Sequence, residues 1–293
     1  MSGATLTLTG LTKRWPNGAL ALDDVSVTVP AGSTLVVLGS SGAGKSTLLR
    51  LIAGLERPDG GEVRLGERSL TGEGTYVAPE ERGVGMVFQA LELWPHMTVA
   101  EHIAFGLPGR SRGRKARALP DVARLAAEVG LPAGLLGRRP DTLSGGEQQR
   151  VAIARTLAPE PGVILYDEPL ANLDPDRRAT IRRLIRRLAR QHGTTLVYVT
   201  HDPQEALELG DAVAVFDGGR LVEHGAPVDL YRAPRTLIGA RAMGAVNALP
   251  AEVRDGMATS ALGSHATEAA DGDGLVLWRP EGIRAADAGS LRV

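Results

Sequence analysis

Hydrophobic and polar residues alternate through the first thirty residues of the chain. This period of two predicts two β-strands at the edge of a mixed sheet. A short hydrophobic run over Leu35–Leu38 predicts a buried strand, and the pattern of Thr47–Gly54 predicts the helix that follows it. Glu62–Leu65 and Gly85–Phe88 predict two further strands.

Residues from about 91 to 160 have a different character. Hydrophobic positions recur there at helical spacing, with no clear strand between them, over Val99–Phe105, Pro120–Val129 and Glu147–Leu157. Strands and helices alternate again beyond, over Val163–Tyr166, Arg177–His192, Thr195–Val199, Pro203–Leu209 and Ala212–Phe216. We therefore predict an α/β core over residues 1–237 with an inserted helical subdomain, and a small β-rich appendage over residues 238–293.

Composition narrows the classes of function. The 293 residues carry a formal net charge of -1 and the pI is about 6.6, so no broad basic field is present to recruit nucleic acid. The chain has no cysteine, which excludes a disulfide framework and a cysteine nucleophile. The first residues lack the pattern of a secretory signal, and no run reaches the roughly 18 apolar residues of a membrane-spanning helix. Any membrane role is therefore expected to go through a partner.

A phosphate-binding loop follows the buried strand. The pattern G-x-x-x-x-G-K-[ST] is matched between an apolar strand and a helix, which is the context that distinguishes this loop from a chance Gly/Ser turn. Backbone N–H groups would wrap the phosphates, Lys45 would reach the β- and γ-phosphates, and Ser46 would supply a hydroxyl to Mg²⁺. The predicted ATP-binding residues are Gly39, Ser40, Ser41, Gly42, Ala43, Gly44, Lys45, Ser46 and Thr47.

A second apolar strand, Val163–Tyr166, ends in two carboxylates. We expect this strand to run beside the strand of the phosphate loop, so that Asp167 holds Mg²⁺ and Glu168 polarises the attacking water. A solvated acidic turn is the alternative.

The segment Leu143–Arg150, with the sequence LSGGEQQR, resembles the LSGGQ signature of ATP-binding cassette (ABC) ATPases. Glu147 stands where glutamine is commonest. The resemblance implies that Ser144, Gly145, Gly146 and Glu147 face an ATP held by a second copy, in a head-to-tail homodimer with two ATP molecules at the interface. The alternative is an ordinary serine cap on a helix.

Other elements of this family follow in order. The resemblance implies that Gln89 contacts Mg²⁺ and water, that Asp174 of the D-loop Ala171–Asp174 lies near the nucleotide, and that His201 contacts the γ-phosphate. Trp15 falls where the family stacks an aromatic ring on adenine, with core packing as the alternative. The family fold implied is a P-loop core with an antiparallel β subdomain, a helical subdomain and a C-terminal appendage.

Two further segments resemble importer ATPases. Leu91–Val99 resembles their LFPHMTV stretch, and Arg279–Ile283 resembles the RPE element of the transport-associated (TOBE) barrel. The resemblance implies a peripheral subunit at the cytoplasmic face of the cell membrane that drives permease subunits, indirectly serves a solute-binding protein and does not bind nucleic acid. The solute class would be sugar, polyamine, iron, sulfate or phosphonate, and the TOBE-like segment is expected to be incomplete. A soluble ABC ATPase acting on DNA, chromatin or ribosomes is disfavoured. The interval from Lys45 to Ser144 is too short for the long coiled coil of the chromosome-maintenance type, and one cassette rather than two disfavours the ribosome-acting type.

Three surfaces leave alternatives open. The helix Arg177–Arg190 is basic and amphipathic, which suits either a charged partner surface or, as we favour, a core helix with arginines in solvent. A basic cluster over residues 110–117 is expected to be a solvated surface. The loop from Gln89 to Thr98 carries apolar residues, among them Trp94, that would either dock a permease helix or pack between the two subdomains.

Overall fold

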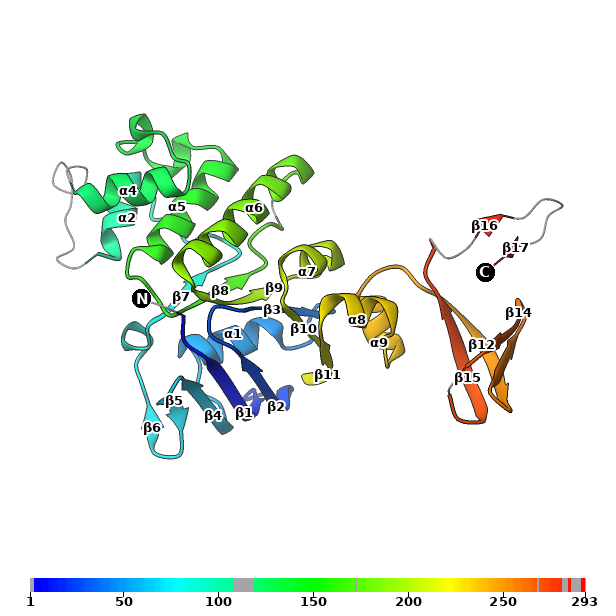
Figure 1. Cartoon of the computed structure of the whole chain (residues 1–293). Helices are drawn as coiled ribbons and strands as arrows, with labels where there is room; N and C mark the ends of the chain where they lie inside the picture. The colour runs from blue at the N-terminus through cyan, green and yellow to red at the C-terminus, as the bar shows by residue number, and fades with distance from the viewer. Residues whose placement is uncertain are drawn as a thin grey trace.

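The computed structural model describes residues 3–107, 119–171, 173–267, 269–280, 284–285 and 291–292. Figure 1 shows a central mixed sheet, a second sheet on one side of it, helices on the other, and a separate C-terminal sheet. No helix in these ranges is both long and apolar enough to cross a membrane.

The central sheet has six strands in the order β11-β10-β3-β9-β8-β7, and only β11 runs antiparallel to its neighbour. Continuous hydrophobic runs form its strands because both faces are covered. The expectation that the carboxylate-bearing strand lies beside the phosphate-loop strand is wrong, since β9 lies between β8 and β3. The parallel strands still bring their carboxyl ends to one edge of the sheet. The bounds are β3 Thr34–Gly39, β7 Val84–Val87, β8 Val163–Asp167, β9 Thr195–Val199, β10 Ala212–Asp217 and β11 Arg220–Gly225.

The N-terminal strands form a sheet of their own, with the order β2-β1-β4-β5-β6 and antiparallel pairing throughout. The prediction of strands here is confirmed, but their placement at the edge of the mixed sheet is wrong. Alternation shows that one face of a strand is buried and does not show which sheet the strand joins. The bounds are β1 Leu6–Arg14, β2 Leu20–Val29, β4 Gly60–Leu65, β5 Arg68–Gly72 and β6 Thr75–Tyr76.

Two hydrophobic cores flank the central sheet. One contains the antiparallel sheet and α1 (Lys45–Ala53), and the other contains the helical segments. The predicted helical segments are confirmed, and the described residues between 91 and 160 contain no strand. Of the described helices, this segment contains α2 Val99–Phe105, α4 Pro120–Glu128 and α5 Gly145–Leu157. Helices α6 Pro175–His192 and α7 Pro203–Leu209 follow it, and 3-10 turns occur at Pro79–Glu81, Ala133–Leu135 and Pro140–Thr142.

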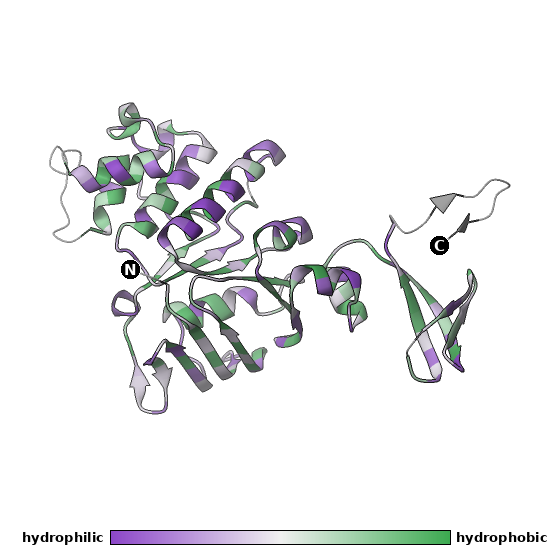
Figure 2. Ribbon diagram, in the orientation of Figure 1, coloured by the Kyte–Doolittle hydropathy of each residue, from purple (hydrophilic) through white to green (hydrophobic). Residues whose placement is uncertain are grey.

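The basic helix α6 is part of the core. Ile181, Leu184, Ile185 and Leu188 are buried, and most of the arginines of the helix are exposed. In Figure 2, α6 is accordingly largely purple, the colour of hydrophilic residues. The favoured interpretation, a core helix with arginines in solvent, is confirmed. The basic cluster near residues 110–117 lies outside the described residues.

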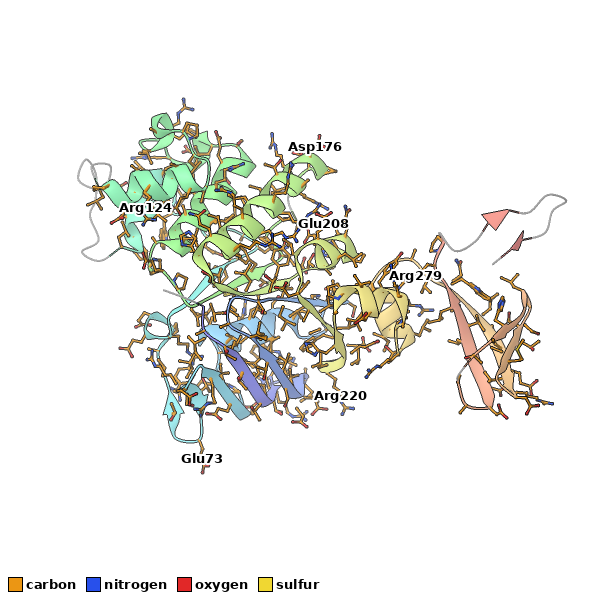
Figure 3. All side chains as sticks on the ribbon, viewed as in Figure 1. Glu73, Arg124, Asp176, Glu208, Arg220 and Arg279 are labelled. Carbon is orange, nitrogen blue, oxygen red and sulfur yellow. The ribbon has the colours of Figure 1, made fainter. Side chains whose placement is uncertain are left out.

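The C-terminal part contains a four-stranded antiparallel sheet in the order β14-β13-β12-β15 and a separate strand pair. Helix α9 occupies residues 237–242, so the strand-rich part begins at Asn247 rather than at residue 238. Arg279 ties this sheet to the preceding helices, because its guanidinium donates to the carbonyls of Tyr231, Ala240 and Gly244 (Figure 3). Glu281–Ile283 of the RPE element lie outside the described residues. The bounds are α8 Pro227–Arg232, α9 Leu237–Ala242, β12 Asn247–Arg254, β13 Met257–Ser260, β14 Gly263–Ala266, β15 Gly272–Trp278, β16 Arg284–Ala285 and β17 Leu291–Arg292.

Candidate functional site

The loop between β3 and α1 requires glycine at two positions. Gly44, the N-cap of α1, has φ 98°, and a Cβ there would lie 2.3 Å from the carbonyl oxygen of Ala21. A Cβ at Gly39 would lie 2.4 Å from the carbonyl oxygen of Phe216. The loop therefore packs against the backbones of β2 and β10, and its own N–H groups can turn toward an anion at the start of α1.

Lys45 is almost fully buried at 6% exposure. Its Nζ donates to the carbonyl oxygens of Gly39 and Ser40, both at 2.9 Å, and lies 4.0 Å from a carboxylate oxygen of Glu168. Burial lowers the pKa of Lys45, and the carboxylates of Glu168 and Asp167 oppose that shift. The ammonium group is thus held inside the loop, where it would meet a bound phosphate.

Ser46 and Asp167 meet across the sheet edge, with the Ser46 hydroxyl donating to Asp167 Oδ1 at 2.9 Å. Burial raises the pKa of Asp167, the hydrogen bond from Ser46 opposes this, and the charge of Glu168 adds to it. A bound cation would stabilise such a buried carboxylate. The hydroxyl and carboxylate oxygens are ligands that Mg²⁺ accepts together with phosphate oxygens, so the residues fit this ion.

Glu168 and His201 form a pair beside this cluster. His201 Nδ1 lies 3.2 Å from Glu168 Oε2, and the backbone N–H of Glu168 donates to the carbonyl of Val199. Glu168 has φ 42°, in the left-handed region that costs a non-glycine residue energy. Strain of this kind concentrates at functional sites, and the Glu168 carboxylate here lies 4.0 Å from Lys45 Nζ of the loop.

Gln89 and Trp15 lie in two loops, after β7 and between β1 and β2. Gln89 is exposed, two residues beyond the end of β7. Trp15 is half-buried in the turn between β1 and β2, with Lys13 Nζ 5.2 Å from its ring centroid. That turn lies next to Ala21, whose carbonyl borders Gly44. An incompletely buried ring at this place leaves the adenine-stacking interpretation available.

The signature residues lie apart from Lys45, at the start of α5. Ser144 and Glu147 form a capping box, in which the Ser144 N–H and hydroxyl donate to Glu147 Oε2 at 2.7 and 2.9 Å. These hydrogen bonds lower the pKa of Glu147. A cavity of about 280 Å³ here is lined by Ser144, Gly146 and Glu147 together with the start of α6.

The D-loop residue Asp174 is the N-cap of α6 and accepts from the Arg177 N–H at 3.0 Å. Asn172 lies outside the described residues, but the loop on either side of it is fixed. Arg178 donates to the carbonyls of Leu173 and Ala171 at 2.9 and 3.3 Å. One chain thus assembles two separate groups, the loop with its carboxylates, and the signature with the D-loop.

A family model described as "ABC transporter" matches residues 22–171. The sulfate/thiosulfate import ATP-binding protein CysA 2 of Chromobacterium violaceum is 44% identical over 268 residues, which cover 90% of this chain and 71% of that protein. The chain belongs to the ABC transporter family. The sn-glycerol-3-phosphate import ATP-binding protein UgpC of Jannaschia sp. is 40% identical over 294 residues, which cover 98% of this chain and 82% of that protein. The Fe(3+) ions import ATP-binding protein FbpC of Pseudomonas fluorescens is 42% identical over 266 residues, which cover 90% of this chain and 74% of that protein.

A solved ABC cassette has the same fold. The structure described as a dimeric post-hydrolysis state of the ATP-binding cassette MJ0796 bound to ADP and Pi is 31% identical, with a TM-score of 0.66, and covers 76% of this chain and 98% of that one. The predicted fold, family and class of activity, an ATPase of an import system, are therefore confirmed.

Two supporting groups in this ABC ATPase have no signal in the sequence pattern. Arg82 is fully buried and donates to the carbonyls of Leu51 and Ile52 at the C-terminal end of α1. The buried carboxyl of Glu205 accepts from the hydroxyl of Tyr198, close behind His201, and burial raises the pKa of Glu205. An apolar strand position such as Tyr198 gives no sign of a polar partner, so pattern reading alone could not find this pair.

Proposed function

We propose that this chain binds and hydrolyses ATP to energise solute import, as one of two identical subunits beneath a permease. The single observation that carries the proposal is the convergence of Lys45, the Ser46–Asp167 pair and Glu168 at one edge of the central sheet. A cation on a phosphate loop, a metal-binding oxygen pair and a water-polarising carboxylate are the parts that phosphoryl transfer to water needs.

Each of these residues would have a separate role in hydrolysis. Lys45 would exchange its contacts with Gly39 and Ser40 for the β- and γ-phosphates, and the loop N–H groups would bind the remaining oxygens. Mg²⁺, held by Ser46, Asp167 and Gln89, would neutralise charge on the phosphate oxygens. Glu168 would polarise the attacking water while His201, 3.2 Å away, holds the carboxylate and faces the γ-phosphate. Trp15 would stack on adenine.

A second copy of the chain would supply the signature residues and Asp174 to the ATP bound at the phosphate loop of the first. Ser144 and the Gly145 and Gly146 amides form a helix N-terminus that can bind an anion, yet their own contacts are to Glu147 and to α6. A head-to-tail dimer would place this signature and Asp174 against the ATP held by the partner. The solved cassette of the same fold described above is dimeric, which supports this arrangement.

The permease contact would lie in a groove of about 900 Å³ whose lining includes Met86, Trp94, Phe105 and Pro159. Trp94 is half-buried there, so neither docking nor packing alone accounts for it. Phe88, the residue before Gln89, lines this groove, which would let a docked permease helix act on the site. The subunit would then sit at the cytoplasmic face of the cell membrane, with a binding protein delivering solute on the opposite side. The similar proteins are named for different solutes, and none is assigned to this chain.

The test uses Glu168→Gln with Glu73→Gln as its control, since Glu73 is exposed at the tip of the β5–β6 hairpin (Figure 3). Glu168→Gln keeps the shape of the site but removes the charge that polarises water, so turnover should fall by about 100-fold or more. Bound ATP should then hold two copies together, and size-exclusion chromatography with ATP should show a dimer. A Glu168→Gln subunit that stays monomeric and hydrolyses ATP as Glu73→Gln does would refute the proposal.

A further inference from the structure

The segment that follows Gln89 has an unusual backbone. Leu91 and Glu92 are consecutive non-glycine residues with φ of 59° and 47°. Left-handed backbone costs each such residue energy, so the surroundings must hold the pair in place. Local turns contribute, through the Leu91 N–H to the Phe88 carbonyl at 3.0 Å and the Glu92 N–H to the Ala90 carbonyl at 2.7 Å.

Arg155 holds the other side of this pair. Its guanidinium donates to the carbonyls of Leu91 at 2.8 Å and Glu92 at 2.5 Å, and its Cζ lies 5.0 Å from the ring centroid of Trp94. The forked donor geometry of arginine suits two adjacent carbonyls, and lysine cannot reproduce it. Burial lowers the pKa of Arg155, and the Glu92 carboxylate opposes the shift.

Arg155 lies in the third turn of α5, whose N-cap is the signature residue Ser144. The helix is continuous between them and spans about 16 Å, so Arg155 moves with the signature. The next residues of the loop are fixed to the same group of helices, because the Trp94 N–H donates to His102 Nε2 at 2.9 Å. Only Gln89 and Ala90 lie between Phe88, the residue that follows β7, and the Leu91–Glu92 pair.

We propose that Arg155 is a positioning residue for Gln89. Arg155 clamps the left-handed Leu91–Glu92 pair to the signature helix α5, and Gln89 lies two residues before this pair. The placement of Gln89 at one nucleotide then depends on the placement of α5, whose N-terminus serves the nucleotide of the partner. This inference rests on the proposed role of Gln89 in hydrolysis.

The first test measures the clamp itself in the full chain. Amide hydrogen exchange across residues 86–98, followed by mass spectrometry, should be faster in Arg155→Gln than in the unmodified chain. Arg187→Gln is the matched control, because Arg187 also donates to a backbone carbonyl, that of Glu128, but lies on α6 away from the loop. Unchanged exchange in Arg155→Gln would overturn the inference.

The second test separates binding from turnover. In Arg155→Gln, kcat for ATP should fall about tenfold or more, with ATP affinity kept within about twofold, since Lys45 and its loop are not touched. Arg155→Lys should lie between Arg155→Gln and the unmodified chain. A purely structural role would lower kcat and the folded fraction together, so the melting temperature and the active fraction are measured alongside.

A backbone contrast keeps the inference testable if Arg155→Gln does not fold. The Glu92 side chain is exposed. Glu92→Gly accepts a positive φ and should keep kcat within about twofold, whereas Glu92→Pro fixes φ near −65° and should match the Arg155→Gln loss. In a double variant the Arg155→Gln and Glu92→Pro losses should not add, because both remove the same conformation. Equal kcat in Glu92→Gly and Glu92→Pro would overturn the inference.

Gln89→Ala separates this inference from the proposed function. If Gln89→Ala loses turnover while Arg155→Gln and Glu92→Pro keep it, the clamp is wrong and the function of Gln89 stands. Unchanged turnover in Gln89→Ala would overturn both.

Discussion

Substitution of Arg82 is the change whose effect on the stability of the fold follows most directly from the structure. It is 0% exposed and donates four hydrogen bonds, to the carbonyls of Val77, Leu51 and Ile52 at 2.9, 3.0 and 2.9 Å and to the Thr71 hydroxyl at 2.8 Å. Two of these acceptors are carbonyls at the C-terminal end of α1, where the helix dipole favours a cation. Burial lowers the pKa of Arg82, yet guanidinium stays charged at neutral pH.

The magnitude follows from that count. A hydrogen bond to a charged group contributes roughly 1.5 kcal/mol net, so losing four of them in Arg82→Ala should destabilise the fold by about 6 kcal/mol before the loss of stem packing. At about 2–4 °C per kcal/mol for a chain of this size, the melting temperature should fall by about 10 °C or more. Arg82→Lys keeps the charge without the fork and should lose roughly half as much.

Circular dichroism melts and urea titrations of the full chain would measure this. Arg64→Ala is the control, since Arg64 also donates to a backbone carbonyl, that of Glu67, and to the Glu62 carboxylate, but its side chain is 37% exposed. Its cost should stay below about 1 kcal/mol. If Arg82→Ala melts within 2–3 °C of Arg64→Ala, roughly 1 kcal/mol, the claim that these buried bonds stabilise the fold is wrong.

Two further outcomes are expected. Lys45→Ala removes the cation of the phosphate loop, so ATP affinity should fall and hydrolysis should vanish; tight ATP binding by calorimetry would contradict the assignment. Trp94→Ala should lower the melting temperature by less than the roughly 3–5 kcal/mol that a fully buried tryptophan is worth, keep ATP binding, and lose assembly with the permease. Strong destabilisation of the isolated Trp94→Ala subunit would refute a docking role for that residue.

The parts of the fold and of the candidate site that the sequence could predict are those formed by residues close together in the chain. A phosphate loop works through consecutive N–H groups, so the run from Gly39 to Ser46 carries its own geometry. Asp167 and Glu168 could be predicted as candidate site residues because a buried parallel strand places its last residues at a known edge of the sheet. The prediction that β8 is the direct neighbour of β3 was wrong, because β9 lies between them. Hydrophobic runs identify buried strands but do not reveal the order of the strands in the sheet.

Glu147 shows a departure from a family pattern that the structure explains. A carboxylate at the third position of α5 accepts from the Ser144 N–H and hydroxyl and lies in the positive field of the helix N-terminus. An amide oxygen could accept the same bonds without the charge. The local geometry of the signature therefore survives the exchange of glutamine for glutamate, and what changes is one negative charge beside the proposed phosphate position.

The roles of the supporting arginines could not be predicted from the sequence for a different reason. Arg82, Arg155 and Arg178 all donate to backbone carbonyls, at the end of α1, in the left-handed loop and in the D-loop. A carbonyl is present at every residue, so no acidic partner in the sequence marks where such an arginine will bind. The acceptors are nevertheless carbonyls at a helix end or in loops, which lack the regular partners of helix and sheet interiors. A guanidinium supplies several donors at once to such groups, and it does so at the three segments that would have to stay in place while ATP is bound and hydrolysed.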